Sequence, residues 1–427
     1  MNVLHELEWR GLVYDQTEGL DAHLASDNVT HYIGFDPTAH SLHVGSLLPI
    51  LALARLQRAG HTPIAVVGGG TGMIGDPSGK SKERSLLTPE QIDHNLEGIR
   101  GQLARFLDFD AVKNPATIVN NADWLGEANL IDFLREIGKH FTVNYMLAKE
   151  STKRRLASDD GISYTEFSYL LLQSWDFLVL NQRYGCTLQL GGSDQWGNIT
   201  AGIELIRRMR SGKAHGLVMP LVTSASGVKF GKTEAGTVWL DAELTSPYRF
   251  YQFWRNTSDQ DVVSYLKFFT FLTRDEIAEL ETALAEKPQE QAAQKRLALE
   301  VTSMVHGADA ANSAIRASAV LFGAEIADLS AAELLEIFDD VPSSALDEHA
   351  LDDTNGISVV ELFVASGLET SKGACRRLIK SGGVYVNNRR VTDEQARIGV
   401  DDFLDGRALV LRKGQKRYHV VTRHGDP

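Results

Sequence analysis

The sequence has little cysteine and no long apolar run. Its 427 residues include only two cysteines, Cys186 and Cys375, and this spacing fits neither a disulfide framework nor a Cys-x-x-Cys zinc site. No run of about 18 apolar residues occurs, so we expect no membrane-spanning helix. Residues 1–10 contain Glu6 and Glu8 and lack an apolar core, which argues against a signal peptide. A reducing cytoplasm fits these absences best.

Positive charge is also scarce, but unevenly so. The net charge of −13 argues against a nucleic-acid partner for the chain taken as a whole. Residues 325–353 contain ten acidic residues and no Lys or Arg, whereas residues 354–427 contain 13 basic residues against 8 acidic ones. A basic module behind an acidic connector favours a nucleic-acid contact, with a solvated surface as the alternative.

A strand, a turn and the start of a helix follow each other between residues 30 and 58. Residues 30–35 favour a strand, and His43-Val44-Gly45-Ser46 opens an apolar helix that runs to about Arg58. This order of elements suits phosphate binding, because free backbone N–H groups and the helix dipole point toward the ligand. Gly45 lacks a Cβ atom and would let a ring or a phosphate approach the backbone closely.

This stretch resembles the His-Ile-Gly-His signature of class I aminoacyl-tRNA synthetases. The longer run from Gly34 to Gly45, Gly-Phe-Asp-Pro-Thr-Ala followed by Ser-Leu-His-Val-Gly, is similar to that of bacterial-type tyrosyl-tRNA synthetases. Alone, the short motif also fits a helix start with an incidental histidine. Ser46 replaces the last histidine of the signature, which leaves the role of Ser46 open.

A glycine-rich loop after the apolar strand at residues 62–67 offers two other nucleotide motifs. Gly70-x-Gly72-x-x-Gly75 matches a dinucleotide fingerprint, but a turn sequence follows where that fold needs a helix. An NAD-dependent oxidoreductase would rest on this match alone. Gly79-Lys80-Ser81 suggests a P-loop, yet Ile74 stands where the first P-loop glycine belongs. We therefore expect neither motif to function.

A second signature follows the run at residues 216–223, which we expect to be the last strand of the sheet. Lys229-Phe230-Gly231-Lys232-Thr233 resembles the Lys-Met-Ser-Lys-Ser signature of class I synthetases, in the form typical of tyrosine enzymes. Alone, a lysine-rich surface loop is the simpler interpretation. The two signatures stand in the family's order, about 185 residues apart, and together they favour a synthetase.

A polar stripe marks the predicted helix at residues 166–180. Tyr169, Gln173 and Asp176 follow the spacing i, i+4 and i+7, so they share one face of an otherwise apolar helix. Such a stripe needs partners or a ligand. A buried hydrogen-bond network and a pocket for a polar aromatic substrate both fit the pattern, and tyrosyl-tRNA synthetases carry it.

The resemblance assigns a tyrosine site. It implies that Tyr32 and Asp176 contact the substrate phenol, that Tyr169 and Gln173 hold the ammonium group, and that Gln195 lies on the carboxylate side. Thr71 is expected near the ammonium group, and Asp76 and Asn121 in the same pocket.

The resemblance also assigns the nucleotide chemistry. The implied ATP-binding residues are Gly34, Asp36, His43, Gly45, Ser46, Gly192, Asp194, Val222 and Lys232. The implied catalytic residues, which stabilise charge on the phosphates, are His43, Thr38, Lys229, Lys232, Thr233, Lys80 and Arg84. ATP is a substrate, Mg²⁺ accompanies it, and no dedicated carboxylate cage for a metal and no tightly bound cofactor are expected.

The implied architecture is α/β, with four parts along the chain. A Rossmann-like parallel-sheet domain spans residues 1–225, and its insertion at about 126–160 carries a dimer interface. Six apolar residues there are candidates for the contact or for ordinary core: Phe133, Ile137, Phe141, Val143, Met146 and Leu147. Residues 226–324 contain the second signature and a helical domain, 325–353 form an acidic linker, and 354–427 resemble the S4 RNA-binding module.

The expected partners are L-tyrosine, ATP, tRNA(Tyr) and a second copy of the chain, with no membrane. The expected RNA-binding residues are Lys372, Arg376, Arg377, Lys380, Arg389 and Arg390, which would neutralise phosphates without reading sequence. A tryptophanyl-tRNA synthetase shares the catalytic fold, but the S4-like tail and the polar stripe argue against it. A non-catalytic RNA-binding paralogue is the other alternative, and His43, Lys229 and Lys232 argue against that.

Overall fold

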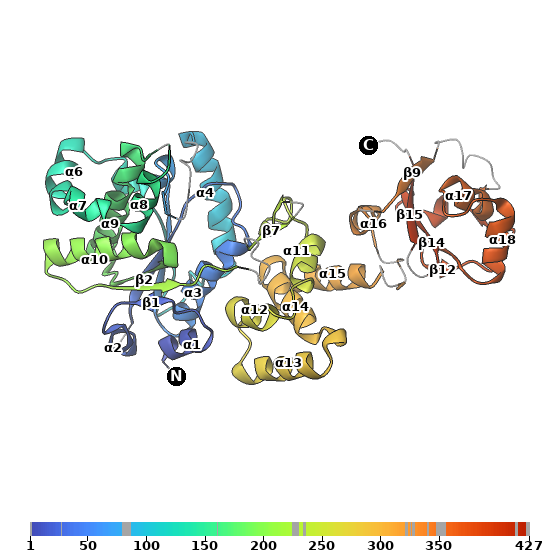
Figure 1. The fold of residues 1–427 in the computed structure, drawn as a ribbon, viewed down its shortest axis with the longest axis horizontal. Coiled ribbons are helices and arrows are strands. Elements are labelled where there is room, and N and C mark those ends of the chain that lie inside the picture. The colour runs from blue at the N-terminus through green and yellow to red at the C-terminus, as the bar shows by residue number, and fades with distance from the viewer. Residues whose placement is uncertain are drawn as a thin grey trace. The chain divides into compact units, whose positions relative to one another are not determined.

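The structure is a computed structural model that describes residues 2–26, 28–78, 87–159, 161–223, 230–233, 236–320, 323–324, 326, 329–339, 341–346, 356–414 and 417–423. The chain forms two compact units (Figure 1). Unit 1 contains residues 1–246 and 253–305, and unit 2 contains residues 247–252 and 306–427.

Unit 1 is built on a six-stranded sheet in the order β1-β6-β5-β2-β3-β4. Its parallel strands are β2 (Thr30–Phe35), β3 (Thr62–Val67), β4 (Thr117–Asn120), β5 (Leu188–Gly192) and β6 (His215–Met219). Their apolar runs are almost entirely buried, as expected for a sheet covered on both faces. The α/β fold class predicted from the sequence is confirmed.

Two details of this sheet differ from the prediction. Residues Asp15–Gln16 form β1, an edge strand that was not predicted and that pairs antiparallel with β6. Strand β6 ends at Met219 rather than at residue 223, because Pro220 follows and cannot donate a ladder hydrogen bond. The order of the strands reverses between β5 and β2, and such a switch point opens a crevice at the carboxyl ends of the strands.

Helices cover the sheet. Helix α3 (Leu47–Arg58) packs on β2 and β3, whereas α9 (Tyr164–Tyr184) and α10 (Trp196–Arg210) pack on each other, with α10 on β5 and β6. Helix α4 (Pro89–Leu103) begins at the capping box that Thr88 and Gln91 form. The remaining N-terminal helices are α1 (Val3–Trp9) and α2 (Leu20–Ala25).

The predicted insertion consists of short helices. These are α5 (Ala122–Leu125), α6 (Leu130–Glu136), α7 (Val143–Leu147) and α8 (Glu150–Leu156). Of the apolar residues considered for a surface patch, Val143 and Leu147 are exposed, whereas Ile137 and Met146 belong to the core. Leu130 and Ile131 on α6 are more exposed than any of the six residues considered.

A small hairpin precedes the helical part of unit 1. Strands β7 (Lys232–Thr233) and β8 (Gly236–Thr237) pair antiparallel, in a region where the sequence indicated only a loop. The helices that follow are α11 (Pro247–Arg255), whose first residues belong to unit 2, then α12 (Val262–Phe269), α13 (Arg274–Glu286) and α14 (Ala292–His306). The helical character predicted for residues 245–323 is confirmed.

Unit 2 begins its own helical part with α15 (Ala308–Val320) and α16 (Ala331–Ile337) and has a five-stranded sheet in the order β12-β11-β14-β15-β9. The strands are β9 (Ser343–Leu346), β11 (Val384–Val386), β12 (Arg389–Arg390), β14 (Ala408–Lys413) and β15 (Arg417–Arg423). Two further short strands, β10 (Ile357–Ser358) and β13 (Arg397–Ile398), pair beside helices α17 (Val359–Ala365) and α18 (Lys372–Lys380).

The acidic stretch at residues 325–353 is more than a connector. Helix α16 packs its apolar face on β14 and β15, with Leu334 and Phe338 in one core with Val410 and Val420. Strand β9 pairs in parallel with β15. The description of this stretch as a linker was therefore wrong for residues 331–337 and 343–346, because its few apolar residues are the ones that complete the core of unit 2.

Candidate active site

A cavity of about 180 Å³ opens at the carboxyl ends of β2 and β5. Eleven of the residues predicted for the site line it: Tyr32, Gly34, Asp36, Thr71, Asp76, Asn121, Tyr169, Gln173, Asp176, Gly192 and Gln195. They come from β2, the loop after β3, the end of β4, helix α9 and the turn after β5. The cavity thus lies at the switch point of the sheet, where ligands of open α/β folds bind.

The loop after β3 does not form a dinucleotide site. It makes one turn of 3-10 helix at Thr71–Met73, and residues 74–78 contain no α-helix. Helix α4 begins only at Pro89. The prediction that Gly70, Gly72 and Gly75 lack the helix of a dinucleotide fold is confirmed for the described part of this loop.

The polar stripe of α9 faces the cavity. Tyr169, Gln173 and Asp176 all line it, and Asp176 is 4% exposed. The three residues line a cavity and also take part in a hydrogen-bond network, so the contacts fit both interpretations of the stripe.

Asp176 is held by two donors. Asn121 Nδ2 donates to Asp176 Oδ2 at 3.0 Å, and Trp124 Nε1 donates to Asp176 Oδ1 at 2.7 Å. Burial raises the pKa of Asp176 to about 7, a rise that these two hydrogen bonds oppose and the nearby Asp36 increases. Sequence reasoning did not include Trp124 among the site residues. The only signal was its place at the carboxyl end of β4, where the parallel strands deliver their site residues.

Two buried polar atoms of the cavity-lining residues have no partner among the described residues. They are the hydroxyl of Tyr32 and Oε1 of Gln189, and these two residues are register partners in β2 and β5. Burial, with the Asp176 carboxylate next in effect, raises the pKa of the Tyr32 phenol, so Tyr32 stays a neutral donor. Gln189 was not predicted, although its place on β5, two residues before Gly191, pointed to this edge. An unsatisfied buried polar atom is costly, so these two atoms suit a ligand with a hydroxyl group.

Two more carboxylates, those of Asp36 and Asp76, line the cavity. Asp36 Oδ1 accepts from Thr71 Oγ1 at 3.3 Å and from the Tyr169 hydroxyl at 3.5 Å. Asp76 Oδ2 accepts from Gln195 Nε2 at 2.7 Å. Burial and then the charge of Asp36 raise the pKa of Tyr169. Carboxylates gathered in this way favour a cationic group.

The amide side chains are ordered by a chain of hydrogen bonds. Gln173 Nε2 donates to Gln195 Oε1 at 3.2 Å, and Asn198 Nδ2 donates to Gln173 Oε1 at 2.8 Å and to Ser78 Oγ at 3.3 Å. Asn198, on α10, and Ser78 were not predicted. Asn198 and Ser78 are buried and do not line the cavity. They therefore position Gln173 and Gln195 from the side that faces away from the cavity.

The first signature lies at the N-terminus of α3. His43 is exposed, and its Nδ1 accepts a hydrogen bond from Gly45 N at 3.0 Å, at the start of a 3-10 turn over Val44–Ser46. A Cβ atom on residue 45 would lie 2.7 Å from His43 Cε1, so glycine is required for this arrangement. The ring of His43 also meets Trp239 edge-on, with ring centroids 6.3 Å apart.

The second signature lies directly beside the first. Val238 N donates to Gly231 O at 3.0 Å, Val44 N donates to Val238 O at 3.0 Å, and Leu240 N donates to Leu42 O at 2.8 Å. A Cβ atom on Gly231 would lie 2.8 Å from Val44 Cγ2. Motifs about 185 residues apart in the sequence are therefore joined backbone to backbone.

Several predicted residues lie outside the cavity wall or the described chain. Thr38, His43, Gly45, Ser46, Asp194 and Val222 are described but do not line the cavity. Asp194 follows Gly192, whose added Cβ atom would lie 2.8 Å from Asp194 Oδ1. Lys80, Arg84 and Lys229 lie outside the described residues, and Lys232 and Thr233 are described by their backbone alone.

The described part of the chain contains neither a metal-ligand group nor a membrane-spanning helix. Within it, no group of three His, Cys, Asp or Glu side chains could hold a metal ion, and no helix is long and apolar enough to cross a bilayer.

In unit 2, the six basic residues predicted to bind RNA are all exposed, on or beside α18 and β12. Lys372 pairs with Glu361, and Lys380 with Glu394, so part of this positive charge is neutralised.

Comparisons with known proteins agree with the geometry. Residues 25–323 match the family model described as tRNA synthetases class I (W and Y), and residues 333–421 match the Tyrosine--tRNA ligase SYY-like C-terminal domain. The chain is 57% identical to the Tyrosine--tRNA ligase of Roseiflexus castenholzii, over 98% of this chain and 99% of that protein. It is 53% identical to the Tyrosine--tRNA ligase of Geobacillus stearothermophilus, over 99% of both.

Among solved structures, a C-terminally truncated mitochondrial tyrosyl-tRNA synthetase of Aspergillus nidulans is similar. Its TM-score is 0.68 and its identity 31%, over 75% of this chain and 94% of that one. A tryptophanyl-tRNA synthetase from Encephalitozoon cuniculi aligns with a TM-score of 0.54 at 13% identity, over 72% and 87%, and shares the fold alone.

Proposed function

The chain belongs to the tyrosine–tRNA ligases among the class I aminoacyl-tRNA synthetases, and we propose that the cavity described above is its L-tyrosine site. The enzyme joins tyrosine to tRNA(Tyr) in two steps. The tyrosine carboxylate attacks the α-phosphorus of ATP, so that pyrophosphate leaves and tyrosyl-adenylate forms. A hydroxyl of the terminal adenosine of the tRNA then takes the tyrosyl group, and AMP leaves.

One observation carries the orientation of tyrosine. The unsatisfied Tyr32 hydroxyl and the charge of the nearby Asp176 carboxylate meet in this cavity, which the carboxylates of Asp36 and Asp76 also line. The substrate phenol would donate to Asp176 and accept from Tyr32, while the ammonium group meets Tyr169, Gln173 and their neighbours. Phenylalanine would leave the buried polar atoms unpaired, which is costly, so discrimination follows from the same contacts.

We assign ATP to the joined signatures. The N-terminus of α3, with Gly45, and the hairpin that begins at Gly231 suit the phosphates. Gly34, Asp36, Gly192, Asp194 and Val222 would surround the adenosine. No covalent nucleophile is needed, because positioning and charge stabilisation carry phosphoryl transfer.

Charge on the phosphates would be stabilised by residues of both signatures and of the loop after β3. These are His43, Thr38, Lys229, Lys232, Thr233, Lys80 and Arg84. Removing any one of these phosphate interactions should cost about 2–4 kcal/mol in the transition state. Mg²⁺ would enter with the phosphates of ATP, where it neutralises charge. We propose that this metal is held mainly by the substrate.

We further propose a cytoplasmic homodimer with an RNA-binding C-terminal part. The exposed apolar residues of α6 and α7 support a dimer contact in the insertion, and the exposed basic residues of α18 support an S4-like RNA contact. The division into catalytic, helical and S4-like parts is kept as a proposal, with the last part extended to include α16 and β9.

Amino-acid-dependent ATP–pyrophosphate exchange tests the proposed sites. Tyrosine, tryptophan and phenylalanine are compared on the wild type, on Lys232→Ala, and on Lys113→Ala, which changes an exposed loop lysine away from the cavity. We expect exchange with tyrosine alone, largely lost in Lys232→Ala and retained in Lys113→Ala. Exchange with tryptophan would overturn the assignment of Asp176, and full exchange in Lys232→Ala would overturn the ATP site.

A further inference from the structure

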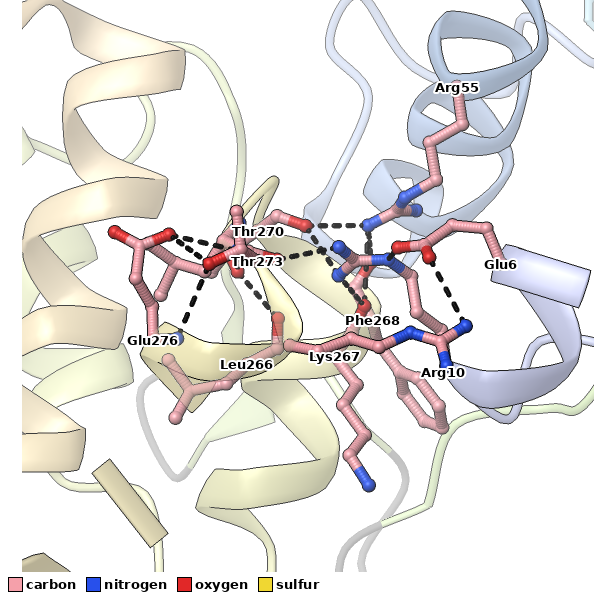
Figure 2. Close-up of polar contacts among 11 residues, drawn as sticks. Glu6, Arg10, Arg55, Leu266, Lys267, Phe268, Thr270, Thr273 and Glu276 are labelled. Atoms are coloured by element: carbon pink, nitrogen blue, oxygen red, sulfur yellow. Dashed lines mark hydrogen bonds and ion pairs between the residues drawn. The ribbon is translucent and has the colours of Figure 1, made fainter. Parts of the chain in front are cut away.

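Two buried arginines hold the carbonyl end of α12. Arg55 Nη2, from α3, donates to the carbonyl oxygens of Lys267, Phe268 and Thr270 at 3.3, 2.8 and 2.8 Å. Arg10, beside α1, donates through Nη1 to Lys267 O and Thr270 O and through Nη2 to Leu272 O. Figure 2 shows both guanidinium groups converging on this helix end. Three segments distant in the sequence are thereby tied together.

Burying these two arginines costs free energy, because their charged groups are removed from water. Arg10 and Arg55 are 4% and 6% exposed, and Glu6 is the carboxylate that pairs with Arg10. Within the described chain, Arg55 has no partner for Nε or Nη1. The helix C-terminus, with its free carbonyl groups and negative dipole end, offsets part of the cost. Apolar residues of similar volume often stabilise a fold as well as or better than buried charged residues. The two buried arginines therefore suggest that the exact position of the α12 end matters.

Helix α12 in turn anchors the second signature. Phe230, the residue before Gly231, is 9% exposed, and its ring stacks on Phe269 with centroids 5.1 Å apart and planes 9° apart. Tyr265 and Trp254 also meet the ring of Phe230, at 5.1 and 5.7 Å. Phe269 is the last residue of α12, next to the carbonyl groups that the arginines hold. A shift of this helix end would therefore move Phe230.

The other end of the connection is the first signature. Helix α3 begins directly after Ser46 and carries Arg55 in its last turn. Helix α3, which has 12 residues, thus links His43 to the hydrogen bonds that Arg55 donates at the end of α12. The two signatures are joined twice, by the backbone hydrogen bonds at Val44 and by this longer route.

We propose that Arg55, supported by Arg10, is a positioning residue for the second signature, acting through α12 and the Phe269–Phe230 stack on the residues that contact ATP. This rests on the ATP site proposed above. Because the route does not pass through the tyrosine cavity, the effect should fall on ATP alone. A misplacement of about 1 Å can cost about a hundredfold in rate.

The test compares Arg55→Met, Arg55→Lys and Arg58→Met in tyrosine-dependent pyrophosphate exchange, with tyrosine affinity measured separately. Arg58 lies on the same helix and covers the Phe271 ring, whereas the hydrogen bonds to the α12 carbonyl groups come from Arg55. We expect kcat/KM for ATP to fall about ten- to a hundredfold in Arg55→Met, less in Arg55→Lys, and hardly in Arg58→Met. The KM for tyrosine should change less than about twofold in all three, because the route does not pass through the tyrosine cavity. A general loss of folded enzyme would lower kcat without changing either KM.

Phe230→Leu provides the second measurement. If Arg55 acts through the aromatic stack, Arg55→Met and Phe230→Leu together should cost less than the product of their separate effects on kcat/KM for ATP. Should Arg55→Met fail to fold, Arg55→Lys takes its place in this cycle. Unchanged ATP parameters in a folded Arg55 variant, or fully multiplicative effects, would overturn the positioning role. Exchange that survives Lys232→Ala would instead overturn the ATP site itself.

Discussion

Trp124 Nε1 donates a hydrogen bond of 2.7 Å to Asp176 Oδ1, inside the wall of the cavity. The indole therefore fixes the carboxylate that we assign to the substrate phenol, and it opposes the rise of its pKa. Neither residue is near the other in the sequence. We therefore expect the specificity of the proposed tyrosine site to depend on this contact between α5 and α9 as well as on Asp176 itself.

Replacing Trp124 by phenylalanine should weaken tyrosine binding selectively. Trp124→Phe keeps an aromatic ring and removes the donor, so the carboxylate loses a hydrogen bond worth about 1–2 kcal/mol. We expect the KM for tyrosine in pyrophosphate exchange to rise about five- to thirtyfold, with the KM for ATP unchanged. Trp175→Phe is the control, because the Trp175 ring packs at a tilt against Phe133, whereas the indole that donates to Asp176 is that of Trp124. Equal effects of the two substitutions would contradict the assignment.

The raised pKa of Asp176 predicts a pH-dependent stability. Its value is about 7 in the folded protein against 3.8 for an ordinary carboxyl group. Since the folded state holds the proton more tightly, the related stabilisation is complete below about pH 4 and is lost as the pH rises through 7. Asp176→Asn cannot ionise and should escape this loss.

The measurement is urea unfolding of both proteins at pH 5 and pH 8, without tyrosine. The free energy of unfolding of Asp176→Asn minus that of the wild type should become more positive by about 2–3 kcal/mol from pH 5 to pH 8. A difference that does not change with pH would show that Asp176 titrates near its ordinary value, and a change in the opposite direction would contradict the raised pKa.

Much of the fold was predictable because it depends on local patterns in the sequence. The apolar runs of β2, β3 and β4 and the capping box before α4 each depend on a few neighbouring residues. Strand β9 has no such signal, since Ser343–Leu346 becomes a strand only by pairing with β15, far along the chain. The acidic composition around it suggested a linker, and composition does not reveal which neighbours are present.

The site divides in the same way. The stripe of Tyr169, Gln173 and Asp176 was predictable, because helical periodicity alone puts these residues on one face. Trp124 and Gln189 were missed because neither belongs to a periodic pattern of polar residues, and the role of each comes from neighbours on other elements. The joining of the two signatures through Val44 and Val238 is likewise a tertiary contact that no spacing rule gives.

Gly231→Ala should disturb ATP use without affecting tyrosine. Gly231 has φ of +81°, and an added Cβ atom would lie 2.8 Å from Val44 Cγ2, so the hairpin must move away from the first signature. Gly236→Ala is a matched control, with φ of +111° and no described atom within 4 Å of the added Cβ. Both variants should lose about 1–2 kcal/mol from backbone strain, but only Gly231→Ala should raise the KM for ATP. If both raise it equally, strain in the hairpin explains the effect and the contact with Val44 does not.

The exposed apolar residues of the insertion should control assembly. Ile131 on α6 is 67% exposed, and Ile131→Asp would place a charge in an apolar dimer contact, where desolvation is costly. We expect sedimentation equilibrium to show dissociation to monomers. Val112→Asp changes a residue that is 99% exposed in a loop and should leave the assembly intact. A wild type that is monomeric at micromolar concentration would contradict the proposed dimer.

The basic residues on α18 should act on tRNA and on no other substrate. Arg376 and Arg377 are exposed and stand near the middle of α18, so a phosphate contact by each should release a counterion on binding. In Arg376→Gln and Arg377→Gln, the KM for tRNA should rise, and the slope of log affinity against log salt should fall by about one for each phosphate contact removed. Pyrophosphate exchange, which needs no tRNA, should stay at the wild-type level. Lys113→Gln removes a positive charge from unit 1 and serves as the control. An unchanged salt slope in both α18 variants would place the RNA contact elsewhere on unit 2, because a residue that meets a phosphate cannot be neutralised without altering counterion release.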